Sequence, residues 1–179
     1  ADATFEAMAA FSDATAEAQA RFNEATFRGV ANFGTAVFEA DASFADATFE
    51  AMTNFSGTFE AIADFRGATF DDDAGFSNVV VRGRLNCETA EFGLWANFRG
   101  AAVSDATFER ATFARVANFE GAVLVHTTFD GTTFEEGAVF RAVTLFDVSF
   151  ADVAFADGEF PDATDGEFPD ATLFDVTFE

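Results

Sequence analysis

The sequence of 179 residues has no lysine and no tyrosine, and it contains one cysteine, one histidine and two prolines. A lone Cys87 excludes an intrachain disulfide framework and any metal site built from several thiolates. No apolar run is long enough to cross a bilayer, and the first residues show neither the basic segment nor the apolar core of a signal peptide. The chain starts at Ala1 instead of Met, so we expect a processed chain or part of a longer one.

Positive charge is also scarce. Nine arginines stand against 32 acidic residues, which gives a formal net charge of −23. Such a surface repels nucleic-acid phosphates and anionic lipid, so we expect neither nucleic acid nor a membrane as partner. It suits a basic protein partner, or a salty environment in which acidic side chains keep a protein hydrated. The second interpretation requires no partner.

Phenylalanine dominates the aromatic content, with 28 Phe and a single Trp95. Over residues 22–55 the phenylalanines are separated alternately by five and six residues, a double repeat of eleven. The residue two before each Phe is Ala, Thr, Gly or Val, most often Ala. Because residues i−2 and i of a strand point to the same face, each unit is expected to place one small and one large side chain inward.

A helical interpretation also has some support, since an eleven-residue period can wind a right-handed coiled coil. At about 100° per residue, however, steps of five and six place successive phenylalanines on two separated stripes, with Thr and Gly abundant between them. A helix would disperse the residues that a set of short strands gathers. We therefore expect β structure.

The units resemble those of the pentapeptide-repeat family, which read as a small residue, a polar residue, a central Leu or Phe and two variable residues. Residues 31–35 (Ala-Asn-Phe-Gly-Thr) and 36–40 (Ala-Val-Phe-Glu-Ala) fit this pattern. The resemblance extends from about residue 2 to residue 179. It implies one domain over residues 1–179: an all-β, right-handed quadrilateral parallel β-helix, or solenoid, with a Phe-stacked core. The frequent sixth residue departs from the strict five-residue unit of the family.

Following the register predicts an unbroken inward ladder through the middle of the chain. Residues 77–91 lose Phe and gain Arg82 and Arg84. We interpret them as a weaker repeat with Val, Leu and Cys in the core, in preference to a functional loop. The predicted core ladder comprises Phe22, Phe27, Phe33, Phe38, Phe44, Phe49, Phe55, Phe65, Phe70, Phe76, Val81, Cys87, Phe92 and Phe98.

The C-terminal part departs furthest from the five-residue step. The octet 157–164 is repeated at once as 165–172, and Pro161 and Pro169 each remove a backbone donor, so 157–172 is predicted to be irregular. No basic residue follows Arg141. The candidate acidic surface comprises Asp157, Glu159, Asp162, Asp165, Glu167 and Asp170.

Few residues remain to carry chemistry. Cys87 lies in the inward register, where we expect a buried thiol instead of a reactive thiolate. His126 and Trp95 occupy corner positions and should project outward. The run 71–73 of three Asp lacks the spacing of a calcium loop, and no phosphate-binding or dinucleotide glycine motif is present. We therefore predict no enzyme activity, no cofactor and no metal site.

Two functions follow from these features. The quinolone-resistance members of the family are rod-like acidic solenoids, so the resemblance implies a non-catalytic binding scaffold that imitates DNA and acts on a topoisomerase such as DNA gyrase, in the cytoplasm. The alternative is a structural, halophile-type acidic repeat segment that associates end to end, outside the cell. The repeat is present at Phe5 and still present at Phe178, so the first and last coils are expected to expose unpaired strand edges. In either case we therefore expect a dimer or a filament formed through the coil ends.

Overall fold

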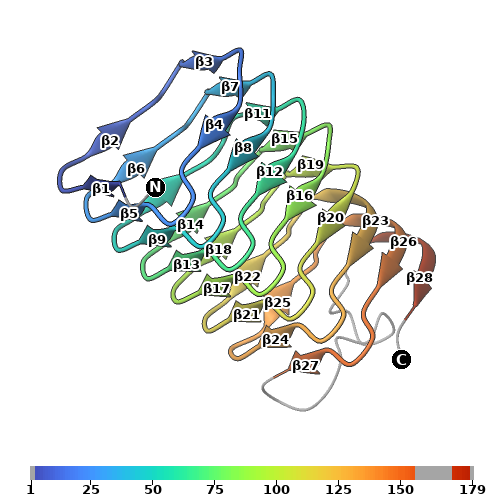
Figure 1. Cartoon of the computed structure of the whole chain (residues 1–179). Helices are drawn as coiled ribbons and strands as arrows, with labels where there is room; N and C mark the ends of the chain where they lie inside the picture. The colour runs from blue at the N-terminus through green and yellow to red at the C-terminus, as the bar shows by residue number, and fades with distance from the viewer. Residues whose placement is uncertain (1–2, 156–170, 178–179) are drawn as a thin grey trace.

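The computed structural model describes residues 3–155 and 171–177. Within these residues every regular element is a β-strand, and all strand pairs are parallel. The strands wind into a right-handed, four-sided β-solenoid, as predicted (Figure 1). No helix that could span a membrane occurs in this part of the chain.

Each side of the solenoid is a column of strands, one from each coil. Side 1 contains β1 (Thr4–Phe5), β5 (Thr26–Phe27), β9 (Thr48–Phe49), β13 (Thr69–Phe70), β17 (Glu91–Phe92), β21 (Thr112–Phe113), β24 (Thr133–Phe134) and β27 (Ala154–Phe155). Side 2 contains β2 (Ala9–Ala10), β6 (Ala31–Asn32), β10 (Thr53–Asn54), β14 (Ala74–Gly75), β18 (Ala96–Asn97), β22 (Ala117–Asn118) and β25 (Ala138–Val139).

Sides 3 and 4 belong to one sheet, because three longer strands near its C-terminal end run through both. Side 3 begins with β3 (Thr15–Ala16), β7 (Val37–Phe38), β11 (Thr58–Phe59), β15 (Val80–Val81) and β19 (Ala102–Val103). Side 4 begins with β4 (Ala20–Arg21), β8 (Ala42–Ser43), β12 (Ala63–Asp64), β16 (Leu85–Asn86) and β20 (Ala106–Thr107). The longer strands are β23 (Val123–Thr128), β26 (Thr144–Ser149) and β28 (Thr172–Thr177).

Two kinds of corner explain the alternation of five and six. A five-residue step contains a tight turn: the amide of Ala25 donates to the carbonyl oxygen of Phe22 at 3.1 Å, and Glu24 takes a φ of 57°. A six-residue step contains an open bend, such as residues 28–30. The sixth residue therefore lengthens a corner and leaves the inward register intact.

The coils are not all of one length. Strand pairing joins residue 26 to residue 48, a coil of 22 residues, and residue 48 to residue 69, a coil of 21. The next pairing, from residue 69 to residue 91, returns to 22. The coil from residue 48 to residue 69 is one residue shorter at the turn that contains Gly57, whose amide donates to the carbonyl oxygen of Phe55 at 2.7 Å. The three later coils on side 1, from residue 91 to 112, 112 to 133 and 133 to 154, again have 21 residues, so coils of either length pair in register.

The core consists of stacked columns of phenylalanine rings. In side 1, Phe27 and Phe49 stack at 4.8 Å between ring centroids with an interplanar angle of 8°, and Phe49 stacks on Phe70 at 4.8 Å. Rings of different columns meet edge to face, as Phe49 and Phe55 do at 88°. Of the predicted ladder, Phe22 is partly buried, and the other members through Phe98 are buried.

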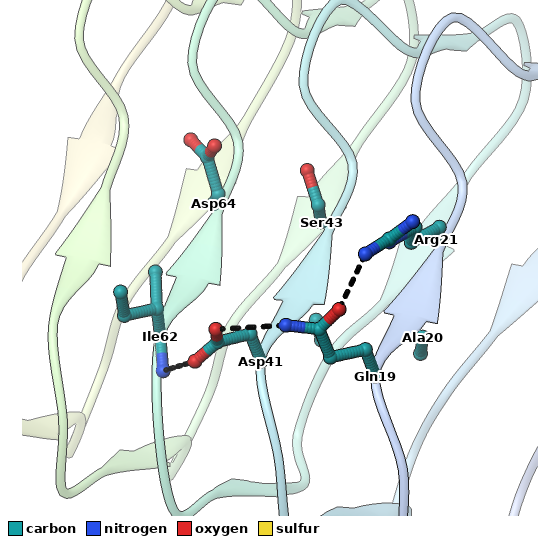
Figure 2. Close-up of a pocket in the computed structure, with 8 residues that line it drawn as sticks. Gln19, Ala20, Arg21, Asp41, Ser43, Ile62 and Asp64 are labelled. Carbon is teal, nitrogen blue, oxygen red and sulfur yellow. Dashed lines mark hydrogen bonds between the residues drawn. The ribbon is translucent and has the colours of Figure 1, made fainter.

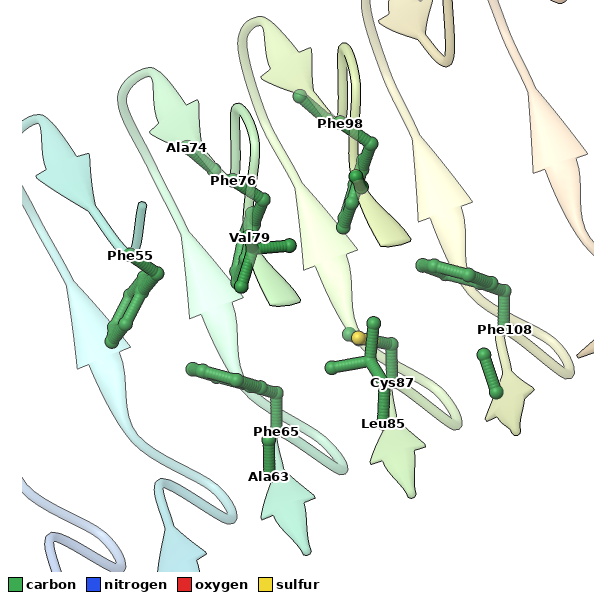
Figure 3. Packing of buried hydrophobic residues seen from close by; sticks show 14 of the residues in the cluster. Phe55, Ala63, Phe65, Ala74, Phe76, Val79, Leu85, Cys87, Phe98 and Phe108 are labelled. Carbon is green, nitrogen blue, oxygen red and sulfur yellow. The ribbon is translucent and has the colours of Figure 1, made fainter. Parts of the chain in front are cut away.

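The stretch 77–91 continues the coil through β15, β16 and β17 without interruption. Figure 3 shows Cys87 in line with Phe65 and Phe108, and Leu85 in the column of Ala63. Leu85 and Cys87 are both buried. Leu85 thus occupies a column of alanines, and Cys87 occupies a column of phenylalanines in the same coil. The larger volume of Leu85 therefore compensates for the smaller volume of Cys87.

The rule that Phe points inward fails at Phe146 and Phe174, which are 42% and 54% exposed. They lie in β26 and β28, where Leu145 and Leu173 take the inward position and pair in register. The two segments read Thr-Leu-Phe, so either apolar residue could have been central. The third corner has two residues here, 146–147, instead of three, so the inward residues on either side of it are Leu145 and Val148.

Candidate functional site

The charged side chains of the described residues lie mostly on the corners. We define the first corner, between sides 1 and 2, as residues 6–8, 28–30, 50–52, 71–73, 93–95, 114–116 and 135–137. The third corner, between sides 3 and 4, comprises residues 17–19, 39–41, 60–62, 82–84, 104–105, 125–126, 146–147 and 174–175. Because adjacent coils are hydrogen bonded in register, equivalent corner residues form columns parallel to the solenoid axis.

The first and third corners carry equal charge. The acidic residues of the first corner are Glu6, Glu50, Asp71, Asp72, Asp73, Glu135 and Glu136, and its basic residues are Arg28 and Arg115. The acidic residues of the third corner are Glu17, Glu39, Asp41, Glu60, Asp105, Asp147 and Asp175, and its basic residues are Arg82 and Arg84. The turn between sides 2 and 3 is neutral, with Asp13 and Glu120 against Arg99 and Arg141.

Several arginines join one coil to the next. Arg28 contacts Glu6 at 2.7 Å, Arg82 contacts Glu60 at 2.6 Å, and Arg110 contacts Glu88 at 2.8 Å. The hydrogen bond and the charge of Glu6 raise the pKa of the Arg28 guanidinium. All these side chains are substantially exposed, so each pair contributes little to stability and weakens with added salt.

A shallow groove lies on side 4 (Figure 2). Its polar groups bind one another: Arg21 donates to Gln19 at 2.5 Å, Gln19 donates to Asp41 at 3.4 Å, and the amide of Ile62 donates to Asp41 at 3.3 Å. The groove therefore offers few polar groups to a ligand, and it lacks the enclosed, convergent geometry of a catalytic site.

The residues considered for chemistry do not gather at one site, because Cys87 lies in the core, His126 on the third corner, and Trp95 and the run 71–73 on the first. Cys87 is buried, and burial followed by the charge of Asp64 holds the pKa of its thiol well above the usual range. His126 projects from the third corner, where its Nδ1 lies 2.7 Å from Oδ2 of Asp147. No group of three His, Cys, Asp or Glu side chains suited to a metal ion occurs in residues 3–155 and 171–177.

The first corner carries a column of apolar residues that the sequence analysis missed. The positions just before the side 2 strands are Met8, Val30, Met52, Asp73, Trp95, Val116 and Gly137. Met8, Met52 and Trp95 are 66%, 50% and 57% exposed. The signal was present in the sequence, because Met8, Val30 and Met52 recur at intervals of 22 residues. We call Met8, Val30, Met52, Trp95 and Val116 the apolar ridge.

The candidate acidic surface of the sequence analysis, Asp157, Glu159, Asp162, Asp165, Glu167 and Asp170, lies outside the described residues. So does most of the segment 157–172 that was predicted to be irregular. Within the described chain, acidic residues gather on the first and third corners and on the turn between sides 4 and 1. The last of these carries Glu24, Asp46, Glu88, Glu109, Asp130 and Asp152.

Comparison with protein-family models gave two matches, both described as pentapeptide repeats, over residues 18–58 and 95–130. The chain belongs to the pentapeptide-repeat family. This assignment agrees with the resemblance noted from residues 31–40. On sides 1 and 3 of this pentapeptide-repeat protein the central residues, such as Phe27 and Phe38, lie within the strands. On sides 2 and 4 the central residues, such as Phe33 and Phe44, directly follow the strands. A search of curated proteins gave no significant match.

Solved structures similar to this pentapeptide-repeat protein include QnrB1, a plasmid-mediated fluoroquinolone resistance protein. That alignment has 16% identity and a TM-score of 0.31, and covers 100% of this chain and 92% of the other. Another is HetL, a pentapeptide-repeat protein involved in heterocyst differentiation regulation from the cyanobacterium Nostoc sp. strain PCC 7120. It has 12% identity and a TM-score of 0.21, over 98% of this chain and 84% of HetL.

Proposed function

We propose that this protein is a non-catalytic binding scaffold whose acidic corners engage a basic protein partner, with a DNA topoisomerase such as gyrase as the specific candidate. The observation that carries the proposal is the arrangement of acidic residues in columns along a rod. Ordered side chains at fixed axial intervals present a charge pattern to a partner without the cost of ordering a flexible segment.

The charge density supports imitation of DNA. Side 1 has eight strands, and their seven intervals of about 4.8 Å give a rod of about 34 Å. Duplex DNA of that length carries about 20 negative charges. The described residues hold 24 acidic side chains and nine arginines, a net charge of −15. The two densities are of the same order.

The test is a gyrase supercoiling assay at increasing concentrations of the protein, with and without a fluoroquinolone. We expect inhibition of supercoiling, or protection of gyrase from the drug, at low salt, and a steep loss of the effect as salt rises. A variant with Asp46, Glu109 and Asp130 changed to Asn, Gln and Asn should act more weakly. The absence of any effect at low salt would exclude gyrase as the partner.

A structural role is the second candidate, favoured by the first described coil. Phe5, Phe11 and Phe22 are only partly buried there, whereas Phe27 and Phe33 in the second coil are buried. Stacking of another coil on this face would cover the three rings. Sedimentation velocity of the purified chain tests this role: a species that grows with concentration supports association through the coil ends, and a constant monomer contradicts it.

A further inference from the structure

The apolar ridge of the first corner is unusual for the outside of an acidic protein. Met8, Met52 and Trp95 are each at least half exposed, and Leu94 beside Trp95 is 38% exposed. Exposed apolar residues gathered along one line indicate an interaction surface more often than scattered ones do. Methionine adapts its shape to a partner, and tryptophan is enriched among the residues that dominate binding energy.

The ridge is held straight by the backbone. The carbonyl oxygens of Val30, Met52, Trp95 and Val116 each accept a hydrogen bond from the amide that starts the side 2 strand of the preceding coil, at 2.8 to 3.4 Å. The side chains therefore repeat at the coil spacing of about 4.8 Å, and five intervals from Met8 to Val116 span about 24 Å. The apolar face of an α-helix repeats at about 5.4 Å, so a helix of about 16 residues matches the ridge in length and nearly in spacing.

The charge beside the ridge selects the partner. Arg28 is shared by Glu6 and Glu50, and Arg115 pairs with Glu136. Asp71, Asp72 and Asp73 have no arginine partner among the described residues. Asp73 accepts a hydrogen bond from the backbone amide of Trp95 at 3.2 Å, so this acidic run and Trp95 are on adjacent coils of the same corner. A Lys or Arg of a partner can lie over the indole face and pair with these carboxylates at the same time.

We propose that the apolar ridge is the docking surface for a basic amphipathic helix of a partner protein, anchored at Trp95. The helix lies along the first corner, with its apolar side chains on Met8, Met52 and Trp95 and its flanking Lys or Arg toward Asp71, Asp72 and Asp73. This inference deepens the proposed binding function and rests on it. A second copy of this chain is a poorer occupant, because each copy carries a net charge of −23.

The single tryptophan and the lack of tyrosine make the test specific. Emission from Trp95 reports on the ridge alone, and the side chain is exposed in the free protein. The probe is an 18-residue Leu/Lys peptide with Leu at helical spacing on one face. We expect a saturable blue shift of the Trp95 emission that weakens with salt. Two control peptides should bind with less than a tenth of the affinity of the Leu/Lys peptide. One has the same composition with its Leu residues distributed around the helix, and the other is oligolysine of equal charge.

The third corner supplies a control of equal charge, because it carries the same number of acidic residues and arginines and only Ile62 as an apolar residue in the equivalent column. Its exposed Phe146 and Phe174 lie one position earlier, in the neighbouring column. By calorimetry, Met8→Ala combined with Met52→Ala should weaken peptide binding at least tenfold, and Ile62→Ala less than twofold. Asp71→Asn with Asp72→Asn should weaken it several-fold, and Glu17→Gln with Glu39→Gln should not. Equal losses at the two corners would overturn the ridge proposal and leave only non-specific charge attraction.

Two other occupants are separate outcomes of the same experiment. A blue shift that appears on raising the protein concentration without peptide, together with a dimer in sedimentation, would assign the ridge to a second copy and overturn the proposal. An equal shift with phosphatidylcholine vesicles would assign it to a lipid surface, with the same consequence. A peptide response without any effect on gyrase would retain the ridge and reject gyrase, so failure of the ridge and failure of gyrase as the partner are distinguishable.

Discussion

Leu85 and Cys87 exchange the side-chain sizes that their columns use in the neighbouring coils. Ala63 and Ala106 flank Leu85 in register, and Phe65 and Phe108 lie on either side of Cys87 (Figure 3). All six side chains are buried. A single coil can therefore depart from the family pattern at two positions, provided that the departures offset each other in volume.

This exchange predicts strong coupling between the two positions. Cys87→Phe alone should destabilise the fold by about 1–3 kcal/mol, because the added ring overlaps the space of Leu85. Leu85→Ala alone should cost about 2–5 kcal/mol through a cavity. The double variant restores the pattern of the adjacent coils and should be more stable than either single variant. Urea unfolding of the four proteins gives the coupling energy, and simple additivity would contradict the exchange.

The stacked Phe column should tolerate truncation poorly. Phe49 is buried between Phe27 and Phe70, so Phe49→Ala should reduce the free energy of unfolding by about 3–5 kcal/mol. Phe146→Ala is the matched control, because that ring is exposed and its loss should change stability by about 0.5 kcal/mol or less. Similar effects of the two substitutions in denaturant unfolding would contradict the assigned inward and outward positions.

Removing one hydroxyl should strengthen the fold. Thr53 is 2% exposed and its Oγ1 has no hydrogen-bond partner. The equivalent inward residues of β6 and β14 are alanines. Thr53→Val keeps the shape and removes the unsatisfied group, so the free energy of unfolding should rise by about 1–2 kcal/mol. A decrease in the thermal midpoint would indicate that the hydroxyl has a partner, such as a buried water.

Alkaline pH should destabilise the protein through Cys87 alone. The folded state holds the pKa of this thiol far above the value of about 8.5 in an unfolded chain, so the unfolded state loses a proton first as pH rises. Above pH of about 8.5 the free energy of unfolding should therefore fall by about 1.4 kcal/mol for each pH unit. No lysine or tyrosine titrates in this range, because the sequence has none.

Urea unfolding of the wild type and Cys87→Ala between pH 8.5 and 10.5 measures this effect. The variant should start lower, because its side chain is smaller, and then stay nearly constant with pH. A slope of the same size in both proteins would show that Cys87 is not the responsible group.

The inward positions could be read from the sequence because they repeat. Phe49 follows a small residue at a fixed interval, and that local pattern determines which way its side chain points. Phe146 was placed inward by the same rule and wrongly so, because Leu145 is an equally acceptable central residue and only the shortened corner decides between them. The exchange of Leu85 and Cys87 depends on volume shared between columns that are adjacent only in the folded coil, so no local pattern contains it.

The candidate site was harder to predict from the sequence than the core, because it consists of residues that the repeat does not constrain. Acidic composition predicted the sign of the surface charge but not its division among corners. The apolar ridge was detectable in principle, since Met8, Val30 and Met52 keep the coil interval. Trp95 was expected to project from a corner, and it does, but its alignment with the methionines becomes evident only once the coils are superposed.

The coil of 21 residues between coils of 22 has a consequence for how such a chain can change in length. Its neighbours pair in the usual register on both sides, so a coil does not need to match the size of the next one. A gene segment encoding one complete circuit could therefore be copied or lost at almost any point, and the remaining sequence would still close its core. The rod would grow or shrink by about 4.8 Å at each event. Selection can thus change the length of the rod one coil at a time, independently of the residues that recognise a partner.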